Sequence, residues 1–253
     1  MTNNTAVVTG SCGFIGREIV KSLIDKDYFV YCLDLENAFL NKDFLNLKIE
    51  NKSQNIPIDL SDDKSMETIK TIIDSNEKID LLVNNAAYYG NINGFDTDFE
   101  GETIEAWNKV IKVNLIMPFF LTQTFAANLK KSQFASVVNI GTMYTEVGPN
   151  LSLYESTNMH NPASYTASKS GLLGVTRWLS TILAPSIRVN MISPGGILRG
   201  QDESFVNKYL ERVPLKRFCS EKDVANLVVY LAGKESRYIT GQNLLIDGGF
   251  TSW

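Results

Sequence analysis

Near its start the chain carries the stretch Ala6-Val7-Val8-Thr9-Gly10-Ser11-Cys12-Gly13-Phe14-Ile15-Gly16, which predicts a strand, a glycine-rich turn and the first residues of a helix. Its three glycines can provide a tight turn, close approach of the backbone to a pyrophosphate, and close packing of the helix on the strand. The free N–H groups at the start of a helix favour an anion. The stretch therefore predicts a dinucleotide-binding site.

An acidic residue follows this stretch at the distance expected for such a site. Asp34 ends the second predicted strand, in Val30-Tyr31-Cys32-Leu33-Asp34. A carboxylate there can bind both ribose hydroxyls of adenosine and repels a 2′-phosphate. Leu35 and Glu36 follow it, not Arg or Lys. The sequence therefore favours NAD over NADP, with a strand-end Asp that only caps a turn as the alternative.

Short apolar runs alternate with amphipathic stretches along the rest of the chain. The runs predict strands at residues 5–9, 29–34, 55–58, 81–84, 136–140, 188–192 and 244–246, and helices that begin near Phe14, Ser61, Thr103, Pro162 and Ser220. Strands that alternate with helices are typical of a parallel sheet. We therefore expect an α/β fold: a Rossmann-like, doubly wound parallel sheet of about seven strands flanked by helices, in one domain spanning residues 1–253.

The second chemical signal is the pair Tyr165 and Lys169, in the run Ser164-Tyr165-Thr166-Ala167-Ser168-Lys169. Side chains four residues apart lie on one face of a helix, about 6 Å apart along its axis. A nearby ammonium favours the phenolate and lowers the pKa of a tyrosine. The pair is therefore a candidate for proton transfer to or from an alcohol or ketone.

Composition excludes several other classes of function. The 253 residues are 44% hydrophobic and 21% charged, with a net charge of −4, which argues against a nucleic-acid-binding surface. We see no apolar run of membrane-spanning length and no histidine–carboxylate cluster typical of a metal site. Three widely spaced cysteines, Cys12, Cys32 and Cys219, form no disulfide framework and favour a reducing cytoplasm.

Taken together, the motifs resemble those of the short-chain dehydrogenase/reductase family over nearly the whole chain. The matching segments are Asp59-Leu60, Asn84-Asn85-Ala86-Ala87, Lys112-Val113-Asn114-Leu115, Val138-Asn139-Ile140-Gly141-Thr142, Ser193-Pro194-Gly195-Gly196-Ile197, Val213-Pro214-Leu215-Lys216-Arg217-Phe218, Tyr238-Ile239-Thr240-Gly241-Gln242 and Asp247-Gly248-Gly249. The resemblance implies an enzyme that interconverts a secondary alcohol and a ketone by hydride transfer to or from a nicotinamide cofactor.

This resemblance assigns roles to individual residues. Tyr165 is the implied acid or base, Lys169 lowers its pKa and holds the nicotinamide ribose, Thr142 polarises the substrate oxygen, and Asn114 supports a water in a proton relay. Tyr144 is an alternative polar contact in the site. The residues implied to bind NAD are Gly10, Cys12, Gly13, Phe14, Ile15, Gly16, Asp34, Asp59, Leu60, Asn85, Ala86, Tyr165, Lys169, Pro194, Gly195 and Ile197.

The chain departs from the family pattern at four points. The glycine spacing is more typical of the extended subfamily, which includes sugar-nucleotide epimerases and dehydratases. Ala87 replaces a glycine, and Thr142 stands in place of the usual serine, which keeps the hydroxyl donor but restricts rotation about χ1. The threonine that often follows the Pro-Gly segment is missing from Ile197-Leu198-Arg199-Gly200.

Three further segments are candidates for the substrate site. Residues 143–162 are rich in hydroxyl, amide and acidic groups, which suit a polar, hydroxylated small molecule better than a lipid. Residues 87–98, with Tyr88, Tyr89, Asn91 and Asn93, can supply another wall. A lid is expected near residues 198–212, where Arg199, Lys208 and Arg212 either meet an anion or form a solvated helix face.

Three hypotheses about function follow. The first is an NAD-dependent oxidoreductase acting on a carbohydrate derivative, similar to enzymes of bacterial surface-glycan and flagellin-modification pathways. The second is an epimerase or dehydratase that retains its NAD, and the third is a non-catalytic NAD-sensing protein. Apolar residues around Trp107–Phe120 and Leu172–Ile182 can pack between subunits, and the resemblance implies a homodimer or homotetramer.

Overall fold

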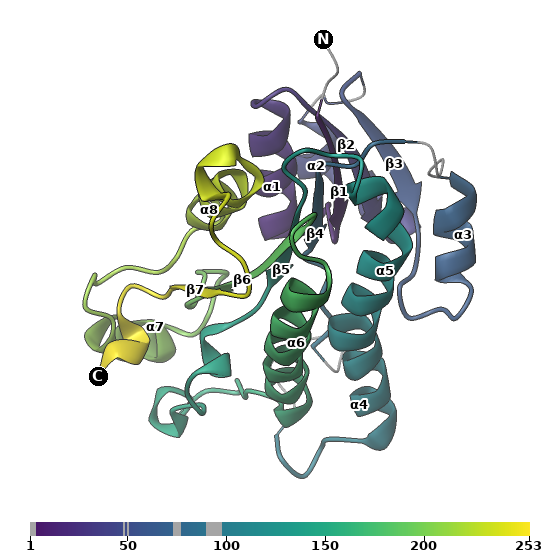
Figure 1. Cartoon of the computed structure of the whole chain (residues 1–253). Helices are drawn as coiled ribbons and strands as arrows, with labels where there is room; N and C mark the ends of the chain where they lie inside the picture. Colours follow the sequence, from purple (N-terminus) through teal and green to yellow (C-terminus); the bar gives the residue numbers. More distant parts are fainter. Residues whose placement is uncertain (1–3, 48, 50, 73–76, 90–97) are drawn as a thin grey trace.

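The fold is one seven-stranded parallel sheet with helices on both faces (Figure 1). The computed structural model describes residues 4–47, 49, 51–72, 77–89 and 98–253. The strand order is β3-β2-β1-β4-β5-β6-β7, and every pair of neighbours is parallel. The strands are β1 (Asn4–Thr9), β2 (Tyr28–Asp34), β3 (Ser53–Pro57), β4 (Leu81–Asn84), β5 (Ser136–Ile140), β6 (Arg188–Pro194) and β7 (Asn243–Ile246).

All seven predicted strands are confirmed, and the order has the reversal expected of a doubly wound sheet. The chain builds outward from β1 to β3 and then returns to the other side of β1 to begin β4. Loops that leave β1 and β4 therefore diverge at the carboxyl edge of the sheet, which opens a crevice between them. The glycine-rich turn after β1 lies at this edge.

Alternation along the central strands sends side chains to two separate cores. In β1, Ala6 and Val8 join one buried cluster and Val7 joins the other. The helices are α1 (Phe14–Ile24), α2 (Lys42–Leu45), α3 (Ser65–Ile72), α4 (Ile104–Ile111), α5 (Met117–Leu129), α6 (Ala163–Ile182), α7 (Glu203–Arg212) and α8 (Glu221–Ala232). Helices α1 and α8 cover the first core, whereas α3, α5 and α6 cover the second.

Helices α4 and α5 form one continuous stretch joined by a π-helical turn, Lys112–Ile116. Pro118 stands at the start of α5 and has no N–H to donate to the Asn114 carbonyl, so the regular hydrogen-bond pattern is interrupted there. By length and composition the stretch Ile104–Leu129 could cross a membrane, which the sequence analysis did not anticipate. Core helices pass the same test, and the inner face of this one is buried against the sheet.

Two other helices differ from expectation. The helix predicted near Ser61 begins at Ser65, because the Asp59 and Asp62 side chains each accept a backbone N–H two residues on and so favour turns over helix. Helix α7 was expected only as part of a lid. The helix predicted at Ser220 is confirmed as α8, and Ser220 and Asp223 form a reciprocal capping box.

Candidate active site

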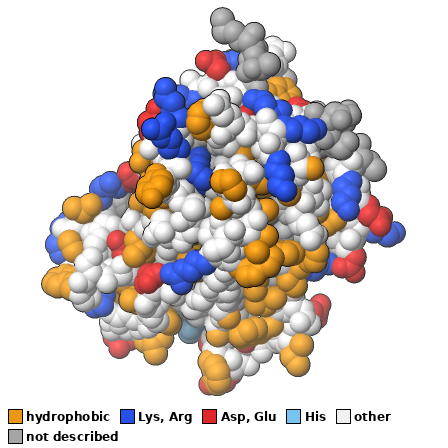
Figure 2. All heavy atoms as spheres, in the orientation of Figure 1, with side chains coloured by type: hydrophobic (Ala, Val, Ile, Leu, Met, Phe, Trp, Pro, Cys, Tyr) orange, Lys and Arg blue, Asp and Glu red, His pale blue; other side chains and the backbone are white. Residues whose placement is uncertain are grey.

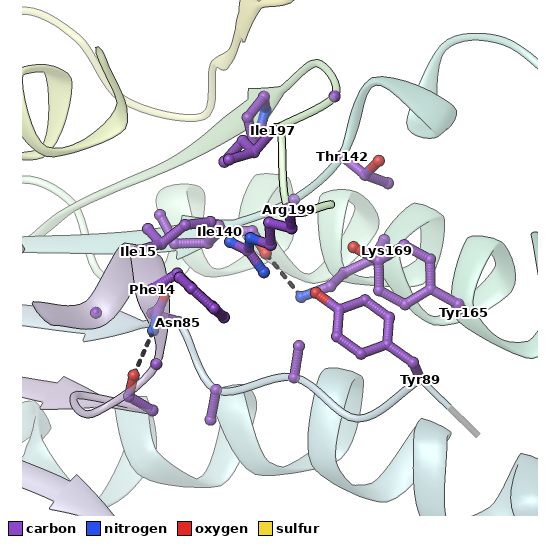
Figure 3. Close-up of a pocket in the computed structure, with 18 of the residues that line it drawn as sticks. Phe14, Ile15, Asn85, Tyr89, Ile140, Thr142, Tyr165, Lys169, Ile197 and Arg199 are labelled. Carbon is purple, nitrogen blue, oxygen red and sulfur yellow. Dashed lines mark hydrogen bonds between the residues drawn. The ribbon is translucent and has the colours of Figure 1, made fainter. Parts of the chain in front are cut away.

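A cavity of about 450 Å³ opens at the carboxyl edge of the sheet, between the turn after β1 and the first turns of α6 (Figure 3). It brings together most of the residues that the sequence assigned to a cofactor and to catalysis. The predicted residues that line it are Gly10, Cys12, Gly13, Phe14, Ile15, Gly16, Asp34, Asn85, Ala86, Thr142, Tyr165, Lys169, Pro194, Gly195 and Ile197.

Two glycines of the first turn are dictated by sterics. Gly10 has a φ of +63°, and a Cβ there would lie 2.8 Å from the Ala86 Cα. A Cβ on Gly16 would lie 2.0 Å from the Gly10 carbonyl oxygen, so only glycine lets α1 approach the turn this closely. Gly13 is less constrained, because its Cβ would meet the same oxygen at 3.4 Å. The glycines therefore hold the N-terminus of α1 against the cavity.

The Asn85-Ala86 segment after β4 fixes this turn from the opposite side. The Asn85 Nδ2 donates to the carbonyl oxygens of Thr9 and Gly10 at 3.0 and 2.9 Å. The Thr9 Oγ1 accepts the backbone N–H groups of Asn85 and Ala86, each at 3.0 Å. These bonds between the ends of β1 and β4 set the width of the crevice.

Asp34 lies at the other end of the cavity, at the end of β2. Its Oδ2 accepts the Cys12 N–H and its Oδ1 accepts the Leu35 N–H, both at 2.8 Å. The turn-capping role that was left open for this residue is thus present. Each oxygen retains acceptor capacity, and Asp34 also lines the cavity, so the carboxylate can accept hydrogen bonds from hydroxyls of a ligand.

Asp59 and Leu60 do not line the cavity, unlike the other residues assigned to the cofactor. Leu60 is buried in the core beneath α3 and α5. Burial alone would raise the pKa of Asp59, but hydrogen bonds from Ser61 and the nearby Lys109 and Lys112 outweigh it and lower that pKa. The carboxylate is therefore committed to the turn that precedes α3.

Tyr165 and Thr142 both line the cavity, Thr142 from the end of β5 and Tyr165 from the first turn of α6. The Tyr89 ring packs on the Tyr165 ring with centroids 4.9 Å apart. Burial, followed by the neighbouring Tyr89, raises the pKa of Tyr165 well above its ordinary value, while Thr142 and Arg199 oppose this. The phenol is therefore protonated at neutral pH.

Lys169, which is expected to lower the pKa of Tyr165, is not among the groups with the largest effect on that pKa. Its Nζ donates to the Ile140 carbonyl oxygen at 2.8 Å and lies 5.9 Å from the Tyr165 ring centroid. Burial lowers the pKa of Lys169 to about 8. The role expected for Lys169 stays a prediction; in this structure burial has the largest effect on the pKa of Tyr165, and the Lys169 ammonium donates to a backbone carbonyl.

Asn114 lies behind the floor of the cavity, in the π-helical turn, and is fully buried. Its carboxamide accepts the Tyr88 N–H at 2.8 Å and donates to the Tyr88 carbonyl oxygen at 2.9 Å. It also donates to the Ser168 Oγ at 3.1 Å, which in turn donates to the Tyr165 carbonyl oxygen at 2.7 Å. Asn114 thus joins the loop after β4 to α6, which places Tyr89 over Tyr165.

The wall expected from residues 143–162 is more aromatic than their composition indicated. Met143, Tyr144, Tyr154 and Met159 face the cavity, and the hydroxyls of Tyr144 and Tyr154 are 2.6 Å apart. Other polar groups of this segment form hydrogen bonds within it: the backbone N–H and the hydroxyl of Ser152 both donate to the Asn150 side-chain oxygen. Of the second expected wall, Tyr89 lines the cavity, while Asn91 and Asn93 lie outside the described residues.

Among the three cations of the expected lid, Arg199 alone lines the cavity. Lys208 donates to the carbonyl oxygens of Ser152 and Glu155 at 2.9 and 3.2 Å, which attaches α7 to the preceding loop. Arg212 packs over the ring of Phe250. The other two cations thus hold the fold together.

Sequence reasoning missed the residues that α7 and its flanks supply. Tyr209 is buried, accepts the Gly196 N–H at 2.6 Å, and lines the cavity with Phe205. Gln201, just before α7, lines it as well, as do Ala38 and Asn41 from the segment after β2. The spacing of Phe205 and Tyr209, which puts both on one helix face, was the signal that could have identified them.

Comparison with known proteins decides the family. A family profile described as enoyl-(acyl carrier protein) reductase matches residues 13–251. A solved short-chain dehydrogenase from Leptospira borgpetersenii with bound NAD+ is 33% identical, superposes with a TM-score of 0.85, and covers 98% of this chain and 93% of its own. The chain belongs to the short-chain dehydrogenase/reductase family.

Two curated relatives show how broad the resemblance within this family is. The 3-oxoacyl-(acyl-carrier-protein) reductase FabG of Buchnera aphidicola subsp. Acyrthosiphon pisum is 30% identical over 255 residues, 98% of each chain. The post-translational flagellin modification protein A of Campylobacter coli is 25% identical over 256 residues, 99% of each chain. This short-chain dehydrogenase/reductase is thus an NAD(P)-dependent oxidoreductase that acts on CH–OH groups.

The residues of the cavity fit a dinucleotide. Side chains are excluded at Gly10 and Gly16, where the backbone must approach closely, and the first turn of α1 contains no acidic residue. An anion can therefore approach the N–H groups of this turn without a clash or a repelling carboxylate. Asp34 supplies hydroxyl acceptors at the far end.

Substitution of Gly16 by alanine tests this cradle. The added Cβ would overlap the Gly10 carbonyl, so we expect Gly16→Ala to raise the Kd for NAD+ at least roughly tenfold and to lower the free energy of unfolding by about 1–3 kcal/mol. Isothermal titration and chemical denaturation measure the two effects.

Gly174→Ala is the matched control, because nothing lies within 4 Å of a Cβ at that position. It should bind NAD+ like the wild type. Unchanged NAD+ affinity in Gly16→Ala would contradict the proposed cradle.

Proposed function

We propose that this short-chain dehydrogenase/reductase interconverts a secondary alcohol and a ketone on a polar, hydroxylated small molecule, with NAD as cofactor and Tyr165 as acid or base. The presence of the hydroxyl-bearing side chains of Tyr165 and Thr142 in the lining of one cavity carries the proposal. Two hydroxyls in one cavity can both bind one substrate oxygen. A cytoplasmic location is part of the proposal, and all three cysteines are free.

The protein's part in the reaction is to place the substrate and to move one proton. A bound nicotinamide supplies or accepts the hydride. Thr142 holds the substrate oxygen, and the protonated Tyr165 donates to that oxygen when a ketone is reduced. Burial raises the pKa of Tyr165, so its hydroxyl carries the proton that a general acid needs for reduction.

Lys169 and Asn114 serve as supports in this proposal. The Lys169 ammonium, which donates to the Ile140 carbonyl and lines the cavity, would hold a ribose hydroxyl of a bound cofactor. Asn114 holds the Tyr88 backbone and, through Ser168, the first turns of α6. Its side-chain hydrogen bonds therefore support a structural contribution to the proton-transfer site.

The preference for NAD rests on Asp34. Its carboxylate faces the cavity at the end of β2, where it would repel the 2′-phosphate of NADP. The nearest candidate cation on α1, Arg17, forms an ion pair with Asp43 at 3.0 Å. Because Arg17 is already paired with a carboxylate, it would do little to offset the repulsion between Asp34 and the 2′-phosphate of NADP.

A polar substrate is supported by the rim of the cavity. The hydroxyls of Tyr144 and Tyr154 and the Gln201 amide belong to residues that line it. Tyrosine rings also offer apolar faces on which a sugar ring can pack. The flagellin modification relative agrees with the expected similarity to enzymes of flagellin modification.

A competing function is reduction of a 3-oxoacyl thioester. The methionines Met143 and Met159 and the ring of Phe205 line the same cavity, and flexible apolar side chains of this kind suit an acyl chain. The reductase relatives agree with it. The hypothesis of an epimerase or dehydratase that retains NAD predicts instead a cofactor that remains bound through purification.

Spectrophotometry with a substrate panel separates these functions. We expect NADH to form when the protein is mixed with NAD+ and a member of a panel of sugars, sugar phosphates and nucleotide sugars, and NADP+ to give a slower reaction. Acetoacetyl coenzyme A with NADH or NADPH is the parallel test. Turnover with the thioester alone would contradict the proposed substrate class, and turnover with NADP+ alone would contradict the role of Asp34.

Removal of the Tyr165 hydroxyl tests the mechanism. Tyr165→Phe should lower turnover by at least roughly a hundredfold, the contribution of one general acid, while the Kd for NAD+ changes little. Tyr238→Phe is the control, since Tyr238 is fully exposed. Turnover near the wild-type rate in Tyr165→Phe would rule out this assignment.

We also propose that a second copy of the chain packs on the outer face of α4, α5 and α6. Figure 2 shows hydrophobic side chains gathered on this face. Its exposed apolar residues are Ile104, Trp107, Ile116, Phe120, Trp178 and Ile182. A contiguous exposed patch of this kind is typical of an interaction surface. Leu172, which the sequence analysis placed at the interface, is buried in the fold.

Sedimentation measures this association. We expect the wild type to sediment as a dimer or tetramer and Trp178→Glu, which places a charge in the patch, to shift toward the monomer. Leu40→Glu is the control, because Leu40 is also exposed but lies outside these helices. A monomeric wild type at micromolar concentration would contradict the proposal.

A further inference from the structure

Arg199 is an uncommitted cation inside the cavity. It follows β6 and reaches toward the glycine-rich turn, where Figure 3 shows it between Phe14 and Lys169. Its guanidinium carbon lies 4.6 Å from the Phe14 ring centroid. Among the residues that the structure describes, no carboxylate forms an ion pair with it and no acceptor binds its guanidinium. A cation so placed can bind an anionic ligand.

The segment that carries Arg199 is held in place by its own hydrogen bonds. Gln201 accepts the Arg199 N–H at 2.6 Å and donates to the Ile197 carbonyl oxygen at 2.7 Å. Ile197 pairs with Cys219 in an isolated β-bridge, and Asp202 caps α7. The backbone around Arg199 is thus held on both sides, and the guanidinium itself packs on the Phe14 ring.

Arg17, the other arginine on the Phe14 ring, differs from Arg199 in having an acidic partner among the described residues. Arg17 also packs on the Phe14 ring, at 5.1 Å, but it is neutralised by Asp43 at 3.0 Å and donates to Asn41 at 3.3 Å. Arg199 stacks on the same ring without such partners. A flat aromatic face orients a guanidinium and leaves its N–H groups along the edge for another ligand.

Two neighbours of Arg199 indicate which anion it faces. Phe14 is the first residue of α1, so the guanidinium lies beside the helix start that favours a phosphate. Arg199 also lowers the pKa of Tyr165 through its charge, which places it toward the catalytic floor. Asp34 marks the opposite, adenosine end. Arg199 therefore lies nearer the phosphate that would join the nicotinamide ribose.

We propose that Arg199, stacked on Phe14, binds the cofactor's pyrophosphate at the phosphate nearest the nicotinamide. The proposal rests on the proposed function, since it assumes a dinucleotide in this cavity. It assigns a positive charge to the segment after Pro194-Gly195, where the sequence lacks the family's usual threonine. The positive charge replaces a neutral hydroxyl donor and makes the contact charge-assisted.

Calorimetric binding of ADP-ribose and AMP tests this contact without requiring turnover. ADP-ribose carries the pyrophosphate, whereas AMP carries only the phosphate on the adenosine side. Arg199→Gln should raise the Kd of ADP-ribose roughly tenfold or more, as expected for loss of one charge-assisted hydrogen bond, and change the Kd of AMP little. For Arg199→Lys, the Kd of ADP-ribose should lie between the values for the wild type and for Arg199→Gln, because lysine keeps the charge but lacks the planar guanidinium.

Two controls make the result specific. Arg237→Gln removes an exposed arginine outside the cavity and should leave both Kd values unchanged. Raising the ionic strength should reduce the difference in the Kd of ADP-ribose between the wild type and Arg199→Gln, since salt screens an exposed charge. Equal weakening of ADP-ribose and AMP by Arg199→Gln would overturn the assignment to the distal phosphate.

Other outcomes assign the cation to a different anion. An unchanged Kd of ADP-ribose in Arg199→Gln overturns the proposal, and a raised KM for a carboxylate- or phosphate-bearing substrate would then identify that group as the ligand. A wild type that does not bind ADP-ribose overturns the dinucleotide site itself. Absence of turnover with the substrate panel, combined with the expected loss of ADP-ribose affinity, contradicts only the proposed reaction.

Discussion

The contact between Gly10 and Gly16 is the constraint on which the candidate site depends. A side chain on Gly16 would lie 2.0 Å from the Gly10 carbonyl oxygen, so helix α1 can press its first turn against the end of β1 only where that side chain is absent. The same approach directs the N-terminus of α1 at the cavity. Asn85 and Thr9 then hold the turn at a fixed distance from β4.

A parallel sheet explains why residues far apart in the sequence meet here. All seven strands run in one direction, so the loops after β1, β4, β5 and β6 leave from the same edge. They carry the glycine-rich turn, Tyr89, Thr142 and Arg199, respectively. Helix α6 adds Tyr165 and Lys169 from below, and Asn114 ties it to the loop after β4 through Ser168 and Tyr88.

Burial determines the protonation states of the two groups on α6. The pKa of Tyr165 rises and that of Lys169 falls to about 8 because both side chains lose solvent. Each neutral form is therefore favoured relative to its state in water. The site differs in this respect from a simple ion pair of a phenolate and an ammonium, and Thr142 and Arg199 supply the interactions that favour the phenolate.

The sequence by itself determined the sheet, the glycine turn and the identity of the residues on the cavity floor. Those features follow from local pattern. The ends of the predicted strands differ from the observed ones by at most two residues, as in β3 and β6. Tertiary structure decided where each side chain is used. Lys208 donates to the carbonyls of a neighbouring loop. Asp59 and Leu60 lie outside the cavity lining, whereas Arg199 is part of it. The physical reason is that burial and hydrogen-bond partners depend on loops that meet only when the sheet assembles, which spacing along the chain does not record.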